Sequence, residues 1–145
     1  MVAPPELHTQ SMAITGGMGG VGMQCAHALA PCTNRLLLAG RSARRPLPRL
    51  FASAALIQAV QLDVGMAADL QSLHSAQPKV VLHASGALAD GVVRNLRAPL
   101  VRKVWASKAS DAVLYGLHGL AMQLPMESTV LFSSVAVPIA AAGQV

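Results

Sequence analysis

Five glycines within the seven residues Gly16–Gly22, GGMGGVG, constrain the fold of this chain more than any other feature of its sequence. A short apolar run at Met12–Ile14 precedes the stretch, and a helical pattern over Gly20–Ala30 follows it. Glycines here allow a tight turn and a close approach of the backbone to a bound group. The stretch therefore predicts a strand that turns directly into a helix, with G-x-G-x-x-G spacing at the turn.

The rest of the chain alternates between the same two kinds of element. Continuous apolar runs at Leu36–Ala39 and Lys79–Ala84 are typical of strands buried on both faces of a sheet. The other predicted elements are strands at Ala55–Val64 and Thr129–Ser133, and helices at Ala67–Ser75 and from Pro99 to about Leu120. This order predicts an α/β fold, a Rossmann-like doubly wound parallel sheet with about five strands.

Two predicted helices carry apolar stripes that we expect to face the core. The stripe of the first helix, which Pro31 ends, consists of Val21, Cys25, Ala28 and Leu29. The stripe of the long helix consists of Leu100, Val104, Trp105, Val113 and Leu117. We expect both cysteines, Cys25 and Cys32, to be reduced, because no cluster of histidines accompanies them to make a zinc site.

The composition excludes several classes of protein. With 145 residues, 53% apolar and 12% charged, the chain has room for at most one domain and is not of the disordered type. No apolar run reaches the roughly 20 residues that span a bilayer, and no signal peptide is evident. A net charge of +5 can suit nucleic acid or a phosphorylated ligand, but 3% aromatic residues are too few for base stacking. We expect a cytoplasmic protein that binds no nucleic acid, membrane or metal.

The glycine stretch has a chemical and a structural interpretation. After a strand and before a helix, the free N–H groups and partial positive charge of the helix N-terminus favour a pyrophosphate. The same glycines could instead serve only to pack the helix on the strand. On the first interpretation the cofactor-binding residues are Thr15, Gly16, Gly17, Gly19, Gly20, Val21 and Gly22.

The end of the second predicted strand discriminates between the two nicotinamide dinucleotides. An NAD site usually carries an acidic residue there, which accepts a hydrogen bond from the ribose 2′-hydroxyl. This chain has Arg41, and a guanidinium can bind a 2′-phosphate that a carboxylate would repel. The sequence therefore favours NADP(H), although Arg41, like Arg44 and Arg45, could also be a solvated surface residue.

Six motifs, in order, together resemble one known family. They are TGGMGGVG, LLLAGRS, LDV, VLHASGALADG, VWASKASDAVLYGL and VLFSSVAVPIAAAGQ. From about Met12 to Gln144 the chain resembles the ketoreductase domain of modular polyketide synthases and related fatty-acid synthases, in the short-chain dehydrogenase/reductase superfamily. The resemblance implies NADPH-dependent reduction of a 3-ketoacyl thioester, bound to an acyl carrier protein, to the 3-hydroxyacyl product. It also implies other domains of a multidomain synthase as partners.

The resemblance implies roles for single residues as well. The implied cofactor contacts are Arg41 and Ser42 at the 2′-phosphate, Asp63 and Val64 beside the adenine, Ala84, Ser85 and Gly86 under the nicotinamide ribose, and Ser133. Lys108 and Ser134 match the family's active-site Lys and catalytic Ser, and Asp90 matches part of a motif that sets product stereochemistry. Ser107 departs from the family pattern, since a Pro more usually precedes that Lys.

The proton donor of the family is a Tyr that would fall just beyond Val145. The single tyrosine here, Tyr115, precedes the last predicted strand and is not followed by the Lys of Tyr-x-x-x-Lys. We therefore expect residues 1–10 to be a linker or tail, and residues 11–145 to be a partial NADP(H)-binding domain, without its C-terminal part and inactive alone. Two alternatives remain, a non-catalytic structural ketoreductase-like subdomain and a truncated stand-alone short-chain dehydrogenase/reductase.

Overall fold

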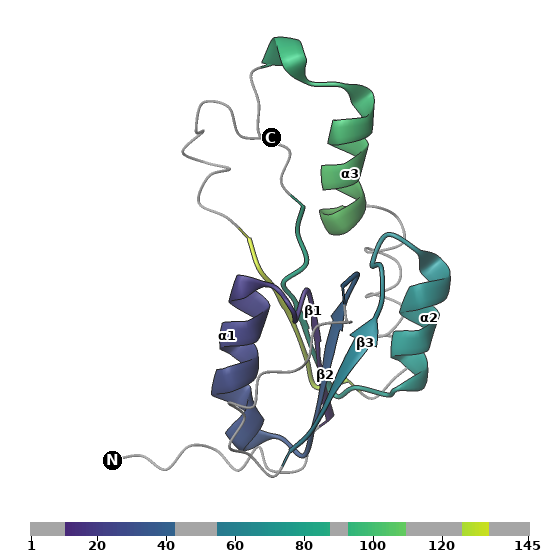
Figure 1. The fold of residues 1–145 in the computed structure, drawn as a ribbon. Coiled ribbons are helices and arrows are strands. Elements are labelled where there is room, and N and C mark those ends of the chain that lie inside the picture. Colours follow the sequence, from purple (N-terminus) through teal and green to yellow (C-terminus); the bar gives the residue numbers. More distant parts are fainter. Residues whose placement is uncertain (1–10, 43–54, 88–92, 110–125, 134–145) are drawn as a thin grey trace.

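The computed structural model describes residues 11–42, 55–87, 93–109 and 126–133, and these residues form a layered α/β unit (Figure 1). The strands are β1 (Ser11–Thr15), β2 (Arg35–Gly40), β3 (Leu56–Gln61), β4 (Val80–His83) and β5 (Ser128–Leu131). The helices are α1 (Gly20–Leu29), α2 (Ala67–Ser75) and α3 (Ala98–Lys108), with single 3-10 turns η1 (Ala30–Cys32) and η2 (Val93–Asn95).

The five strands form one sheet in the order β3-β2-β1-β4-β5, and every pair of neighbours is parallel. The direction of the strand order reverses between β1 and β4, which makes this the switch point of a doubly wound sheet. Thr15 at the end of β1 lies opposite Ala39 of β2 and His83 of β4, so the three carboxyl ends are level. The predicted fold class and five strands are confirmed.

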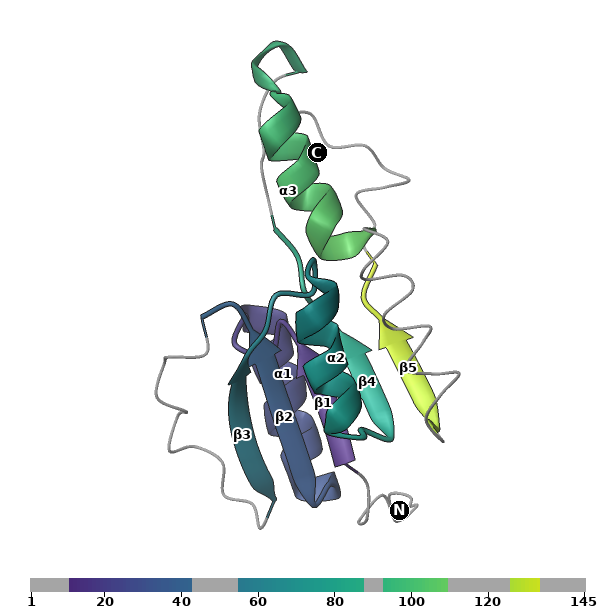
Figure 2. The same ribbon diagram turned by 90° about the vertical axis from the view of Figure 1, so that its right-hand side faces the viewer.

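Alternate residues of the central strands pack against different helices. Leu36 and Leu38 of β2 face α1, whereas Leu37 and Ala39 belong to the cluster on the α2 side. Figure 2 shows the two helices on opposite faces of the sheet. Each fully buried leucine contributes roughly 1.5–3 kcal/mol relative to an exposed one. Burial on both faces explains why β2 reads as an uninterrupted apolar run.

Helix α1 faces the sheet with its smallest side chains. The buried residues of α1 and the turn after it are Gly22, Ala26 and Ala30. Val21 is 55% exposed and Ala28 is exposed as well, so the predicted stripe is wrong at both positions. The cause is the close packing of α1 on the glycine turn, since a Cβ on Gly22 would overlap the carbonyl oxygen of Gly16.

The remaining predictions for the α1 region agree with the structure. The α-helix ends at Leu29, and Pro31 lies in the 3-10 turn that follows. Cys25 is half-buried and packs against the core cluster on the α1 side, and both Cys25 and Cys32 are free thiols. Among the helices in the described ranges, none has the length and apolar character needed to cross a membrane.

Helix α3 differs from the long core helix that the sequence predicts. It ends at Lys108, because Ala109 leaves the helical region with φ −139° and ψ 15°. Trp105 is 62% exposed and Leu100 is 39% exposed, so their predicted place in a buried stripe is wrong. α3 extends past the carboxyl ends of the strands rather than over a face of the sheet (Figure 2), which leaves Leu100 and Trp105 exposed, whereas Val104 is half-buried. Val113 and Leu117 lie outside the described residues.

Candidate functional site

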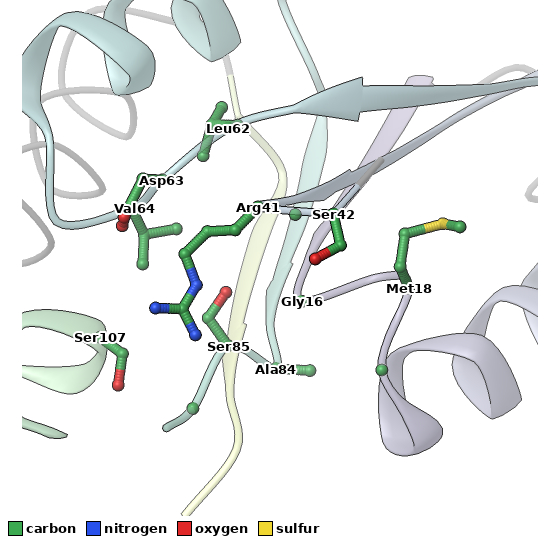
Figure 3. Close-up of a pocket in the computed structure, with 13 residues that line it drawn as sticks. Gly16, Met18, Arg41, Ser42, Leu62, Asp63, Val64, Ala84, Ser85 and Ser107 are labelled. Atoms are coloured by element: carbon green, nitrogen blue, oxygen red, sulfur yellow. The ribbon is translucent and has the colours of Figure 1, made fainter. Parts of the chain in front are cut away.

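A pocket opens at the carboxyl ends of the strands, beside the switch point between β1 and β4 (Figure 3). Its volume is about 290 Å³, close to the lower end of the range of roughly 300–1,000 Å³ for small-molecule sites. The pocket is lined by nine of the predicted site residues: Gly16, Gly19, Arg41, Ser42, Asp63, Val64, Ala84, Ser85 and Gly86. Open α/β sheets bind their ligands at this position in the fold.

The other predicted site residues lie beside the pocket or outside the described ranges. Thr15 is buried below it, Gly17 packs under it against β2, and Gly22 packs against the turn. Val21 and Ser133 are exposed and do not line the pocket, and a Cβ on Gly20 would meet nothing within 4 Å. Lys108 lies next to Gly86, as discussed below. Ser134 and Asp90 fall outside the residues that the structure describes.

The glycine turn brings backbone, rather than side chains, to the pocket wall. Gly16 has φ +71°, and a Cβ there would lie 2.6 Å from the carbonyl oxygen of Ala84. The Gly19 N–H donates to the Gly16 carbonyl at 2.9 Å, which closes the turn directly before α1. The first turn of α1 contains no acidic residue, so its N–H groups and dipole remain favourable for an anion.

Arg41 supplies a positive charge to the pocket from the end of β2. Figure 3 shows its side chain extending from the end of β2 into the pocket. Neither a hydrogen bond nor an ion pair holds its guanidinium within the described part of the chain. An unpaired guanidinium inside a pocket can bind a phosphate in a bidentate manner.

Two carboxylates fix the loop after β3, which forms another part of the pocket wall. The Asp63 N–H donates to Asp69 Oδ2 of α2 at 2.7 Å, and Asp63 Oδ1 accepts from the Gly65 N–H at 2.9 Å. These two bonds hold the loop in one conformation, with Leu62, Asp63 and Val64 along the pocket. Their side chains can therefore form a preformed surface for a flat ring.

A buried histidine joins the two strand ends beneath the pocket. Thr15 Oγ1 and His83 Nδ1 share a hydrogen bond of 2.7 Å between the ends of β1 and β4. Burial lowers the pKa of His83 from its ordinary value of 6.5; the Ser107 backbone opposes that shift in part, and the Lys108 ammonium adds to it. His83 is therefore a neutral residue with a structural role.

This lowered pKa predicts a loss of stability in mild acid. Below about pH 6.5 the unfolded chain protonates His83 while the folded chain does not, so stability falls as the pH drops toward the lowered pKa. We expect urea midpoints to decrease between roughly pH 7.5 and 5.5, and the decrease to be smaller in His83→Asn. His74→Asn on α2 is the control. Equal slopes for the wild-type chain and His83→Asn would contradict this role.

The pocket also contains four residues that the sequence predictions missed: Met18, Gly40, Leu62 and Ser107. Met18 and Gly40 adjoin predicted residues, and Leu62 precedes Asp63, so proximity along the chain was the available signal. Ser107 comes from α3, which is distant in sequence from the strand ends. Its only signal was its departure from the Pro-Lys pattern.

The arrangement suits a dinucleotide better than a metal ion. The glycine cradle, which a Cβ would fill, and the unpaired guanidinium together offer two places for phosphate. Within the residues that the structure describes, no group of three or more His, Cys, Asp or Glu side chains could hold a metal ion.

Comparison with known proteins identifies the family. The KR domain family profile matches residues 11–145. The chain is 32% identical to erythronolide synthase EryA2 of Saccharopolyspora erythraea over 90% of its length, and 29% identical to a mycocerosic acid synthase-like polyketide synthase of Mycobacterium tuberculosis over 99%. Among solved structures it is similar to the first ketoreductase of the tylosin polyketide synthase, with 30% identity, a TM-score of 0.82 and coverage of 93% of this chain.

These relatives are far longer than this chain. The chain spans 4% and 8% of the two synthases and 31% of the tylosin ketoreductase structure. The family profile covers more than half of the chain. The chain therefore belongs to the KR domain family, the ketoreductase domains of polyketide synthases within the short-chain dehydrogenase/reductase superfamily.

Proposed function

We propose that this chain binds NADP(H) in the pocket at the carboxyl ends of β1–β4, as the cofactor-binding part of a ketoreductase domain spanning residues 11–145. The observation that carries the proposal is the Arg41 guanidinium, which lines the same pocket as the glycine turn and has no partner among the residues that the structure describes. A 2′-phosphate distinguishes NADP(H) from NAD(H), and Arg41 stands at the end of β2, where the preference is set.

In this proposal, different groups of residues bind different parts of the cofactor. The glycine turn and the α1 N-terminus bind the pyrophosphate, and Arg41 with Ser42 binds the 2′-phosphate. Asp63 and Val64, held by the bonds to Asp69 and Gly65, flank the adenine. The segment Ala84–Gly86 supports the nicotinamide ribose. NADPH, when bound, supplies the hydride that reduces a ketone.

The substrate in this proposal is a 3-ketoacyl thioester carried by an acyl carrier protein, and the other domains of a synthase are partners. In this proposal Ser134 hydrogen-bonds the substrate carbonyl and Lys108 helps to tune the site, while the proton for the developing alkoxide comes from the family's Tyr. A donor stabilises that charge only where it is already oriented toward it. Asp90 contributes to the stereochemistry of the 3-hydroxyl product.

The test separates cofactor binding from turnover. We expect the 145-residue polypeptide to bind NADPH saturably, detected by nicotinamide fluorescence, and to consume no NADPH with a 3-ketoacyl N-acetylcysteamine thioester. The reason is that its single tyrosine, Tyr115, is not placed in the family's donor motif. A full-length relative serves as the active control. Absence of saturable NADPH binding would favour a structural subdomain, and steady NADPH consumption would refute the proposed inactivity of this polypeptide.

A further inference from the structure

The side chain of Ser107 makes a hydrogen bond between α3 and the turn that follows β4. Its Oγ accepts a hydrogen bond from the Ala87 N–H at 3.0 Å and donates to the Val104 carbonyl, one turn back in α3, at 2.9 Å. The residue is only 8% exposed, in a helix whose other residues are mostly exposed. The hydroxyl therefore ties the end of α3 to the turn that follows β4.

The same helical turn touches two of the loops around the pocket, those after β3 and β4. A Cβ on Gly65 would lie 3.3 Å from the Ala106 carbonyl oxygen. A Cβ on Gly86 would lie 3.1 Å from Cε of Lys108 and 3.4 Å from its Nζ. The amine of Lys108 is therefore in close contact with the Ala84–Gly86 wall, although no hydrogen bond or ion pair holds it there within the described residues.

We propose that Ser107 is a positioning residue, whose hydroxyl holds the last turn of α3 so that Lys108 stays beside Gly86, next to the nicotinamide half of the cofactor. This inference rests on the proposed binding of NADP(H). Within the segment Trp105–Lys108, Ser107 is the residue that departs from the family's usual Pro-Lys, and this proposal gives it a role. A proline side chain has no oxygen to accept from the Ala87 N–H.

The loss of this hydroxyl should weaken the binding of only one half of the cofactor. In Ser107→Ala the buried Ala87 N–H loses its acceptor, so the turn after β4 and the end of α3 are no longer held together. The glycine turn and the loop at Asp63 are held by other bonds and stay in place. The nicotinamide half should therefore bind less well, while the adenosine 2′-phosphate half should bind unchanged.

The experiment compares the binding of two ligands to the wild-type 145-residue chain and to three variants of it. We expect Ser107→Ala to weaken NADPH binding about threefold to tenfold, the range that one neutral hydrogen bond supplies, and to leave the Kd for adenosine 2′,5′-bisphosphate unchanged. Ser75→Ala is the matched control, because Ser75 Oγ likewise donates to a helical carbonyl, that of Gln71, but at an exposed position of α2. It should change neither Kd. Ser107→Thr, which keeps the hydroxyl, should restore the ratio of the two affinities.

A second readout follows Lys108 itself. We expect bound NADPH to protect Lys108 from acetylation in the wild-type chain, measured by peptide mass spectrometry, and to protect it less in Ser107→Ala at equal saturation. Gly86→Ala, whose Cβ would displace the end of Lys108, should reproduce this loss if Ser107→Ala fails to fold. If Ser107→Ala weakens the binding of both ligands equally, or leaves the protection of Lys108 by NADPH unchanged, the inference is overturned. Failure of the wild-type chain to bind either ligand would instead overturn the proposed function.

Discussion

Replacement of Gly16 by valine will abolish NADPH binding and lower the free energy of unfolding by at least about 2 kcal/mol. Two independent causes act at this position. Gly16 has φ +71°, which a β-branched residue adopts only with strain. A Cβ there would also lie 2.6 Å from the Ala84 carbonyl oxygen and 2.7 Å from the Ser85 nitrogen, so the turn after β4 must move.

The matched control for this variant is another glycine of the same turn. A Cβ on Gly20 meets nothing within 4 Å, and Gly20 opens α1 with ordinary helical geometry. Gly20→Ala should therefore leave the free energy of unfolding unchanged or raise it by roughly 0.4–1 kcal/mol. Urea unfolding and NADPH titration measure both effects. If Gly16→Val unfolds at the wild-type urea concentration and binds NADPH, the glycine turn is not the cradle that we describe.

Arg41→Glu will reverse the preference between NADPH and NADH. Its guanidinium has no protein partner in the described residues, so removal leaves no buried charge unpaired. Loss of charge-assisted bonds to a 2′-phosphate, with repulsion added, should weaken NADPH binding roughly 100-fold or more. A carboxylate at this position can accept from the ribose 2′-hydroxyl, so the Kd for NADH should stay level or improve.

Arg35→Glu is the control for the change in net charge. Arg35 lies at the opposite end of the same strand, β2, where it donates to Gln58 Oε1 at 3.3 Å. It should leave the ratio of the Kd values for NADPH and NADH unchanged. The same shift in that ratio for both variants would mean that overall charge, rather than a 2′-phosphate contact, sets the preference.

Most of the fold could be predicted from the sequence, because the apolar pattern of most segments agrees with their place in the folded structure. The apolar run of β2 is buried on both faces, and α2 spans Ala67–Ser75 as its periodicity indicates. The stripe of α1 could not be predicted, because close packing on the glycine turn selects Gly22 and Ala26 over larger apolar residues. The position of α3 depends on contacts between residues that are distant in sequence. Its apolar residues therefore predicted a buried stripe, whereas Leu100 and Trp105 are exposed.

The glycines of the stretch divide between packing and the lining of the pocket. Gly17 and Gly22 pack the turn against β2 and α1, whereas Gly16 and Gly19 line the pocket. Spacing alone could not separate these two tasks, because both require the absence of a Cβ. Ser107 was missed for another reason: its contact with Ala87 crosses twenty positions and appears only when the chain is folded.

Hydrogen exchange with and without NADPH is the most direct test of the proposed site. We expect slower exchange in peptides that contain Gly16–Gly22, Arg41–Ser42, Asp63–Gly65 and Ala84–Ala87, which meet only at the carboxyl ends of the strands. Exchange in α2 and at the Arg35 end of β2 should be unchanged. Protection that is absent from all four segments, or that is confined to other parts of the chain, would contradict NADP(H) binding at the switch point.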